Sequence, residues 1–218
     1  MTGVFKFIAE GGSWMWPILM AQVVSFALIG ERVVALYMRR SGNLKSRVRQ
    51  YEEEIKKGNL DKIVTRTNGQ SSDALSMIVR AGAQSAMQGS GKEEIQLRMD
   101  EMVLEETSRI EQRIAFLATI ANVATLMGLL ATIMGLITSF TSISAANGAE
   151  KAKILSDGIS EAMNGTAYGL VVAVPALIAY AILQSRANSL NEDLNKAALR
   201  LYIWFGFNVE TPVKSKKA

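Results

Sequence analysis

Three long stretches of the chain contain no charged residue, and segments rich in charge separate them. The uncharged stretches are 14–30, 114–149 and 162–185. About 20 apolar residues in a helix span the hydrocarbon of a bilayer, and a charge at the centre of such a helix is costly. The pattern therefore predicts an all-α membrane protein embedded in the lipid bilayer by three transmembrane helices. We place these helices at 14–36, 114–143 and 162–184.

The polar connection at 37–113 is predicted to be helical throughout. Its expected helices are Leu44–Lys57, Asp61–Arg66, Ala74–Gln88, capped by Ser72 or Asp73, and Lys92–Arg113. On the last of these, one face carries a narrow and mainly apolar stripe made of Ile95, Met99, Met102 or Val103, Glu106 and Ile110.

The second and third spans are expected to continue as helices beyond the membrane. No Gly or Pro stands between Lys92 and Ala124, so one unbroken helix from Lys92 to Ser144 is predicted. The third span is expected to run on through 188–201. A kink or a separate helix at each membrane boundary is the alternative. Two of the three spans thus extend into a cytoplasmic helical bundle, completed by the C-terminal helix and tail at 185–218.

Lysine and arginine set the expected orientation. The connection from Arg39 to Arg113 holds 14 of them, and the tail after Ser185 holds six. The segment 1–13 and the short turn at 144–161 hold few. Because cytoplasmic loops carry the excess of basic residues, the connection and the C-terminus are expected in the cytoplasm, and the N-terminus and the turn on the opposite side of the membrane.

The amino-acid composition excludes most of the common catalytic mechanisms of enzymes. The chain has no cysteine and no histidine, so it has no disulfide and no cysteine or histidine nucleophile. It has no phosphate-binding loop and no serine nucleophile elbow. We expect no enzyme, no catalytic residue, no cofactor and no metal site. The net charge of +4 reflects topology, since 12 acidic residues are interleaved with the basic ones of the connection, and no nucleic-acid partner is expected.

Small and hydroxyl side chains form one stripe on each of the last two spans. On the second span the stripe is Thr125, Gly128, Thr132, Gly135, Ser139 and Ser142, and on the third it is Ala162, Gly165, Gly169, Ala173 and Ala176, with Thr166 beside it. Such stripes are typical of close helix packing in membranes. The threonine hydroxyls could equally bond their own i−4 carbonyls. By physics alone, packing is the favoured interpretation.

Two residues, one just before the third span and one within it, have more than one possible role. Glu161 is either a solvated carboxylate at the helix start, favoured by the helix dipole, or, if the helix begins earlier, a carboxylate nearer the membrane with a functional role. Pro175 lies near the middle of the span and leaves the carbonyl of Val171 without its helical donor. That carbonyl can bond a neighbour, or the proline can be a tolerated packing kink.

Two segments resemble a known family. The segment 158–176, GISEAMNGTAYGLVVAVPA, resembles the third-helix signature of the MotA/TolQ/ExbB proton-channel proteins, and 128–140, GLLATIMGLITSF, resembles their second helix. The likeness is to the TolQ/ExbB branch or to a related motor such as one for gliding.

The resemblance implies a homopentamer whose second and third helices line a pore. That pore holds the single transmembrane helices of an ExbD/TolR/MotB-like partner, whose aspartate carries the proton. Thr132, Thr166 and Glu161 match the family's ion pathway, and Gly128, Gly135, Ser139, Gly165, Gly169 and Pro175 belong to pore and helix packing. The function implied is that of a pore-forming stator subunit of an inner-membrane motor. The motor is driven by the proton-motive force and transmits energy to the cell envelope.

Two other functions remain open from the sequence. A non-conducting membrane scaffold would use the same glycine stripes for assembly alone. A solute transporter would be expected to show inverted repeats or broken helices around a midplane site. Three unequal spans show neither feature.

Overall fold

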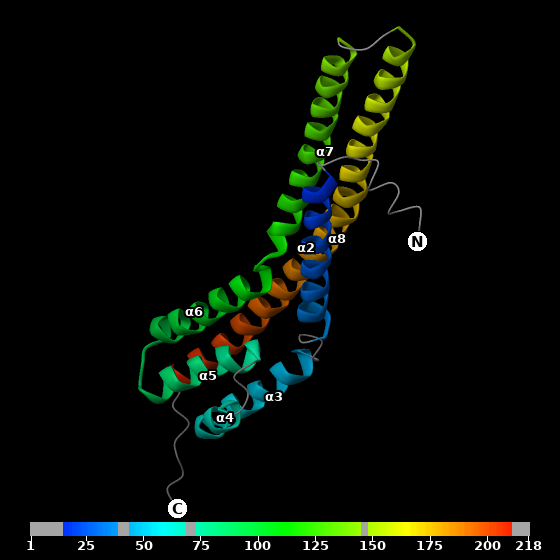
Figure 1. Cartoon of the computed structure of the whole chain (residues 1–218). Helices are drawn as coiled ribbons and strands as arrows, with labels where there is room; N and C mark the ends of the chain where they lie inside the picture. Colours follow the sequence, from blue (N-terminus) through cyan, green and yellow to red (C-terminus); the bar gives the residue numbers. More distant parts are fainter. Residues whose placement is uncertain (1–14, 39–43, 69–72, 145–147, 211–218) are drawn as a thin grey trace, which may run out of the picture. The chain divides into compact units, whose positions relative to one another are not determined.

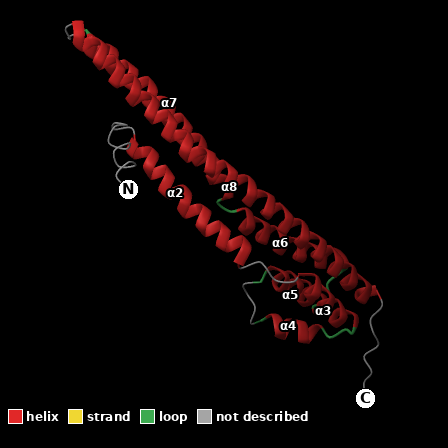
Figure 2. Ribbon diagram, turned by 90° about the vertical axis from the view of Figure 1, so that its right-hand side faces the viewer, coloured by secondary structure: helices red, strands yellow, loops and turns green. Residues whose placement is uncertain are grey.

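The computed structural model describes residues 15–38, 44–68, 73–144 and 148–210 (Figure 1). Within these ranges every element is a helix or a turn between helices (Figure 2). The chain divides into two compact units, one of 1–35 with 113–184 and one of 36–112 with 185–218. The predicted all-α class is confirmed. Three helices are long and apolar enough to cross a membrane, the first of them Met15–Tyr37.

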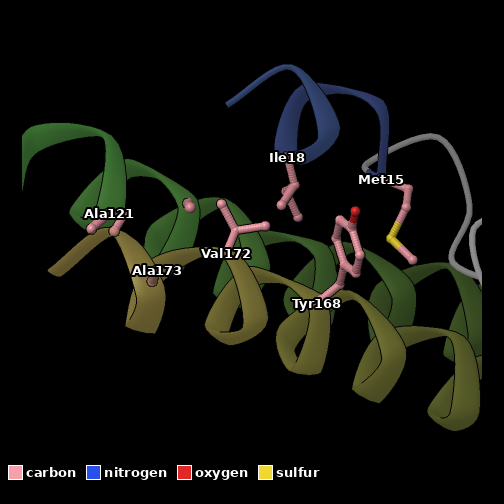
Figure 3. Close-up of a cluster of buried hydrophobic side chains, with 8 residues drawn as sticks. Met15, Ile18, Ala121, Tyr168, Val172 and Ala173 are labelled. Carbon is pink, nitrogen blue, oxygen red and sulfur yellow. The ribbon is translucent and has the colours of Figure 1, made fainter. Parts of the chain in front are cut away.

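The first unit holds α2 (Met15–Val33), α7 (Ile114–Ile143) and the N-terminal part of α8 (Gly148–Glu210). A π-helical turn, η1 (Val34–Met38), follows α2. The core of this unit lies where α2 meets the other two helices (Figure 3). It contains Met15, Ile18, Ala121, Ala124, Tyr168, Val172, Ala173 and Ala176.

The helix α7 has the bounds expected for the second span. By contrast, α8 begins much earlier than the third span was expected to begin. The segment 144–161 was predicted to be a turn, but it is helical from Gly148 onward, and 145–147 lie outside the described residues. The expected continuation of α8 through 188–201 is confirmed.

The prediction of one unbroken helix from Lys92 to Ser144 is wrong. The helix α6 ends at Glu111, and Arg113 adopts a left-handed backbone conformation with φ 63° just before α7 begins. That conformation costs a non-glycine residue roughly 1–2 kcal/mol. The guanidinium of Arg113 donates to both carboxylate oxygens of Glu31, at 2.9 and 3.0 Å. This contact with a residue distant in sequence accompanies the break.

The second unit packs four helices beside the C-terminal part of α8. They are α3 (Leu44–Lys56), α4 (Leu60–Thr67), α5 (Ala74–Met87) and α6 (Lys92–Glu111). Asp73 caps α5 by accepting a bond from the amide of Ser76 at 2.9 Å, while Ser72 lies outside the described residues. The predicted stripe of α6 is buried at Ile95, Met99, Val103, Glu106 and Ile110.

Candidate functional site

The small-residue stripes of α7 and α8 face each other within one chain. A Cβ atom added to Gly128 would lie 3.2 Å from the carbonyl oxygen of Gly165 and 3.2 Å from the Cα of Thr166. A Cβ added to Gly169 would lie 2.7 Å from the carbonyl oxygen of Ala124. The glycines therefore allow backbone to approach backbone, as in other membrane helix pairs.

Other members of the stripes take part in the same packing, while Thr125 and Ser142 are exposed and their hydroxyls donate to carbonyls of their own helix. A Cβ on Gly135 would lie 3.0 Å from the Cβ of Ala162, and one on Gly165 would lie 2.7 Å from the Cβ of Ala131. Ser139 is buried, and its hydroxyl donates to its own i−4 carbonyl at Gly135, at 2.7 Å. The α7–α8 seam is thus made of small side chains along its length, and the packing interpretation of these glycines agrees with the structure.

Two threonines meet across this seam. The Thr132 hydroxyl lies 3.2 Å from the carbonyl of Gly128 on its own helix and 3.2 Å from the carbonyl of Ala162 on α8. It also contacts the Thr166 hydroxyl, which lies 3.0 Å from the Gly128 carbonyl. Thr132 therefore makes the expected i−4 contact, but both hydroxyls also reach across to the other helix. The result is a cluster of two hydroxyls and two carbonyl oxygens.

The threonine pair lies on the side of α7 and α8 that faces away from α2. Tyr168 points toward Met15 and Ile18 (Figure 3), and its hydroxyl bonds the side-chain oxygen of Gln22 on α2. Successive residues of an α-helix are about 100° apart, so Thr166 lies about 200° around α8 from Tyr168. On α7, Thr132 is about 140° from Met127, which packs against the core shared with α2.

No described element of the first unit covers this side, which we call the threonine face. Both threonines are half-buried, so their hydroxyls border its surface. Large apolar side chains surround them and are exposed: Leu129, Met163, Leu170 and Leu177. A surface of this kind, apolar around a small polar centre, is suited to contact with lipid, with another helix or with a narrow water-filled path.

Glu161 lies well inside α8, thirteen residues after its start at Gly148, or roughly 20 Å at 1.5 Å per residue. Its side chain is exposed and bonds no other described residue. It is seven residues from Tyr168 and therefore on the same face of α8, the one that turns toward α2. The structure brings Thr132 and Thr166 together and places Glu161 on the other side of the helix pair.

Pro175 interrupts no helix, because α8 continues through it. It borders a small cavity that α2 lines with Ser25 and Phe26. Pro175 therefore belongs to the contact between α2 and α8, away from the threonine face.

Sequence reasoning missed two polar contacts of this unit, Tyr168 with Gln22 and Arg113 with Glu31. A glutamine and a tyrosine inside otherwise apolar spans were a usable signal, since buried polar groups need partners. The described residues contain no group of three or more acidic side chains that could hold a metal ion. Hydroxyls do not titrate near neutral pH, but they can order water and bond a carboxyl group in either protonation state.

Comparison with known proteins identifies the family to which the chain is similar. The MotA/TolQ/ExbB proton channel family matches residues 70–196, more than half of the chain. The Tol-Pal system protein TolQ of Haemophilus influenzae is 36% identical over 88 residues, which cover 40% of this chain and 38% of that protein. The chain thus spans well under half the length of this relative.

Two further relatives cover more of the chain. The biopolymer transport protein ExbB of Salmonella typhimurium is 27% identical over 203 residues, 87% of this chain and 79% of that protein. A chain in the solved structure of C. jejuni MotAB superposes with a TM-score of 0.56 at 18% identity, covering 88% of this chain and 74% of that chain. This last likeness shows the fold alone. The chain belongs to the MotA/TolQ/ExbB proton channel family.

Proposed function

We propose that the chain is the pore-forming stator subunit of a motor driven by the proton-motive force in a bacterial inner membrane. Work would pass to the cell envelope through a partner of the ExbD/TolR type. Family membership and three apolar spans support an energy-transducing role. The observation that carries the finer proposal is the hydroxyl pair of Thr132 and Thr166 on an otherwise apolar, uncovered face.

In this proposal five copies form a ring with their threonine faces turned inward and α2 outward. The partner contributes a single helix with one aspartate inside the ring. Because neither α7 nor residues 162–185 of α8 carry a charged side chain, the group that takes up and releases the proton inside the membrane would come from the partner. The two hydroxyls would bond that aspartate and the waters beside it.

Glu161 has a separate place in the proposal. Its exposed carboxylate lies on the face that turns toward α2, beyond Tyr168 along α8. Because this face is not the inward one, the Glu161 carboxylate would act on the ion through its charge, near the periplasmic end of the path, and not as part of the pore wall. The distribution of lysine and arginine supports an N-terminus in the periplasm and a C-terminus in the cytoplasm.

Proton flux tests the role of the hydroxyls. The chain is reconstituted with its partner in vesicles, and Thr132→Val and Thr166→Val are compared with Thr138→Val. Thr138 is the matched control, because it lies on the same helix, is exposed and donates to its own i−4 carbonyl at Met134, at 2.9 Å. We expect both pore variants to lose most of the flux and the control to keep it.

The opposite result identifies the alternative function. If both valine variants conduct like Thr138→Val while the oligomer persists, the threonines only pack α7 against α8. A complex without measurable flux in the unmodified protein would favour the non-conducting scaffold.

A further inference from the structure

A small cavity lies between α2 and α8 inside the first unit. Apolar side chains form most of its wall, among them Phe26 and Val172, and Ser25 and Pro175 line it as well. A volume of about 10 Å³ within it is open to the centre of a water molecule, and one bound water needs about 10–15 Å³ by this measure. The cavity therefore has the size of a single water molecule.

The Ser25 side chain is buried at this cavity without a bond to the protein. It is 4% exposed, and its hydroxyl bonds no other described residue. A serine in a helix can donate to the carbonyl four residues earlier, as Ser139 does to Gly135 at 2.7 Å. Ser25 makes no such bond. Because a buried hydroxyl without a partner is costly, Ser25 requires a polar partner inside the cavity.

Two further polar groups border the cavity, since Gln22 and Val171 also line it. The side-chain oxygen of Gln22 accepts from the Tyr168 hydroxyl, but its amide nitrogen donates to nothing in the described part of the chain. Pro175 has no N–H, so the carbonyl of Val171 lacks its usual helical donor. In membrane helices such a carbonyl is satisfied by a neighbouring helix, a side chain or ordered water.

The three groups are placed to share one partner. Gln22 and Ser25 are three residues apart on α2, and Val171 and Pro175 are four apart on α8, so each pair lies on one face of its helix. The wall thus offers a donor in the Gln22 amide, an acceptor in the Val171 carbonyl, and a hydroxyl that can do either. A buried water typically makes about three hydrogen bonds, which is the number available here.

We propose that this cavity binds one water molecule that bridges α2 and α8. The water donates to the Val171 carbonyl and to Ser25 Oγ and accepts from the Gln22 amide. It ties the two helices together at the level of Pro175. An apolar occupant, such as the end of a lipid acyl chain, would leave all three groups unsatisfied. The site lies on the side of α2, so it does not rest on the ion pathway proposed for the threonine face.

A density map of the full-length protein, at a resolution that shows ordered water, tests the site without any variant. We expect one isolated peak within hydrogen-bond distance of both Ser25 Oγ and the Val171 carbonyl oxygen. No peak beside well-defined side chains would overturn the proposal. An elongated density continuous with the surrounding lipid would also overturn it, because it would assign the cavity to an acyl chain.

Ser25→Ala measures what the water contributes to stability. In a hydrated cavity the variant deletes one hydrogen bond of the bridge, and the detergent-purified protein should unfold at a Tm about 2–4 °C lower. In a dry cavity the variant would remove an unsatisfied hydroxyl and raise Tm, which would overturn the proposal. Ser139→Ala is the matched control, because Ser139 is 5% exposed and its hydroxyl donates to its own helix. It should lower Tm by less, and an equal loss would show only the general cost of deleting a buried hydroxyl.

Pro175→Ala tests the third partner of the water. The alanine amide gives the Val171 carbonyl its helical donor, so the water loses an acceptor. In this background Ser25→Ala should lower Tm by less than it does alone, while Ser139→Ala should act as before, since only Ser25 shares the water with Val171. A loss of Tm from Ser25→Ala that is the same in both backgrounds would contradict the bridge.

Discussion

Gly169→Ala tests whether α7 and α8 pack backbone against backbone. The added methyl group would lie 2.7 Å from the carbonyl oxygen of Ala124 and 3.1 Å from the Cα of Gly128. Ordinary van der Waals contact begins at 3.4 Å, so the helices would have to separate by about 0.7 Å at this point. Both neighbours are backbone atoms and cannot turn aside. Overpacking of this kind costs roughly 1–3 kcal/mol.

Gly30→Ala is the matched control for the same chemical change. Gly30 lies within α2, and an added Cβ would meet nothing within 4 Å. There the gain in helix propensity of roughly 0.5–1 kcal/mol is unopposed. Because the same gain in helix propensity applies at residue 169, we expect Gly169→Ala to be less stable than Gly30→Ala by the overpacking cost of about 1–3 kcal/mol.

Thermal unfolding of the detergent-purified protein measures both variants. At about 2–4 °C per kcal/mol for a protein of this size, the Tm of Gly169→Ala should lie about 2–12 °C below that of Gly30→Ala, whose Tm should be equal to or slightly above that of the unmodified protein. The separation would also disturb Thr166, less than one turn away, so ion flux should fall in Gly169→Ala only. A Tm for Gly169→Ala equal to or above that of Gly30→Ala would refute the packing described for the seam.

The remaining predictions concern acid stability, charge and assembly. Burial opposes ionisation of Asp73, but bonds from Arg47 and Ser76 outweigh it and hold its pKa below the ordinary value. Its contribution to stability is therefore present above the unfolded pKa of about 3.9 and is lost as pH falls through the folded pKa. Asp73→Asn should lower Tm at neutral pH, and the difference from the unmodified protein should shrink as pH falls below about 4 and vanish only below the lowered pKa of the folded state; a constant difference would contradict this. Glu161→Gln should strongly reduce ion-driven activity with normal assembly, while Glu150→Gln, in the exposed first turn of α8, should not; equal activity of both would make Glu161 a solvated surface residue. Native mass spectrometry should find a homopentamer, and a dominant monomer or dimer would contradict the proposed ring.

The membrane helices were predictable because charge is excluded from them over long stretches. The start of α7 at Ile114 follows from the first residue of such a stretch, whereas its end at Ile143 lies six residues before the stretch ends at residue 149. The helical break at Arg113 was not predictable, since neither Gly nor Pro marks it and its partner, Glu31, is 82 residues away. The early start of α8 at Gly148 was missed because a polar segment beside a span was taken for a turn.

The residues of the candidate site could be predicted from the sequence, but the contacts that they make could not. Spacing of three and four residues identifies the stripes of small side chains, but it does not say which helix they contact. In the structure they contact each other, and this brings Thr132 against Thr166. Glu161 was assigned to the same ion pathway as the two threonines because all three match the signature of the family. Its rotation about α8 relative to Tyr168, and the position of α2, place it on the other side.

The most direct test of the central claim asks whether the threonine face lines a water-filled path. The chain has no cysteine, so single cysteines report their own positions. Thr166→Cys and Leu170→Cys lie on the threonine face. Val171→Cys is the control, because Val171 is more exposed in the chain than Thr166 or Leu170 but lies beside Pro175, on the side of α2. The measurement is labelling by a membrane-impermeant, charged thiol reagent in vesicles that contain the assembled complex. The account predicts labelling of the first two cysteines and protection of the third; protection of Thr166→Cys and Leu170→Cys together with labelling of Val171→Cys would contradict it.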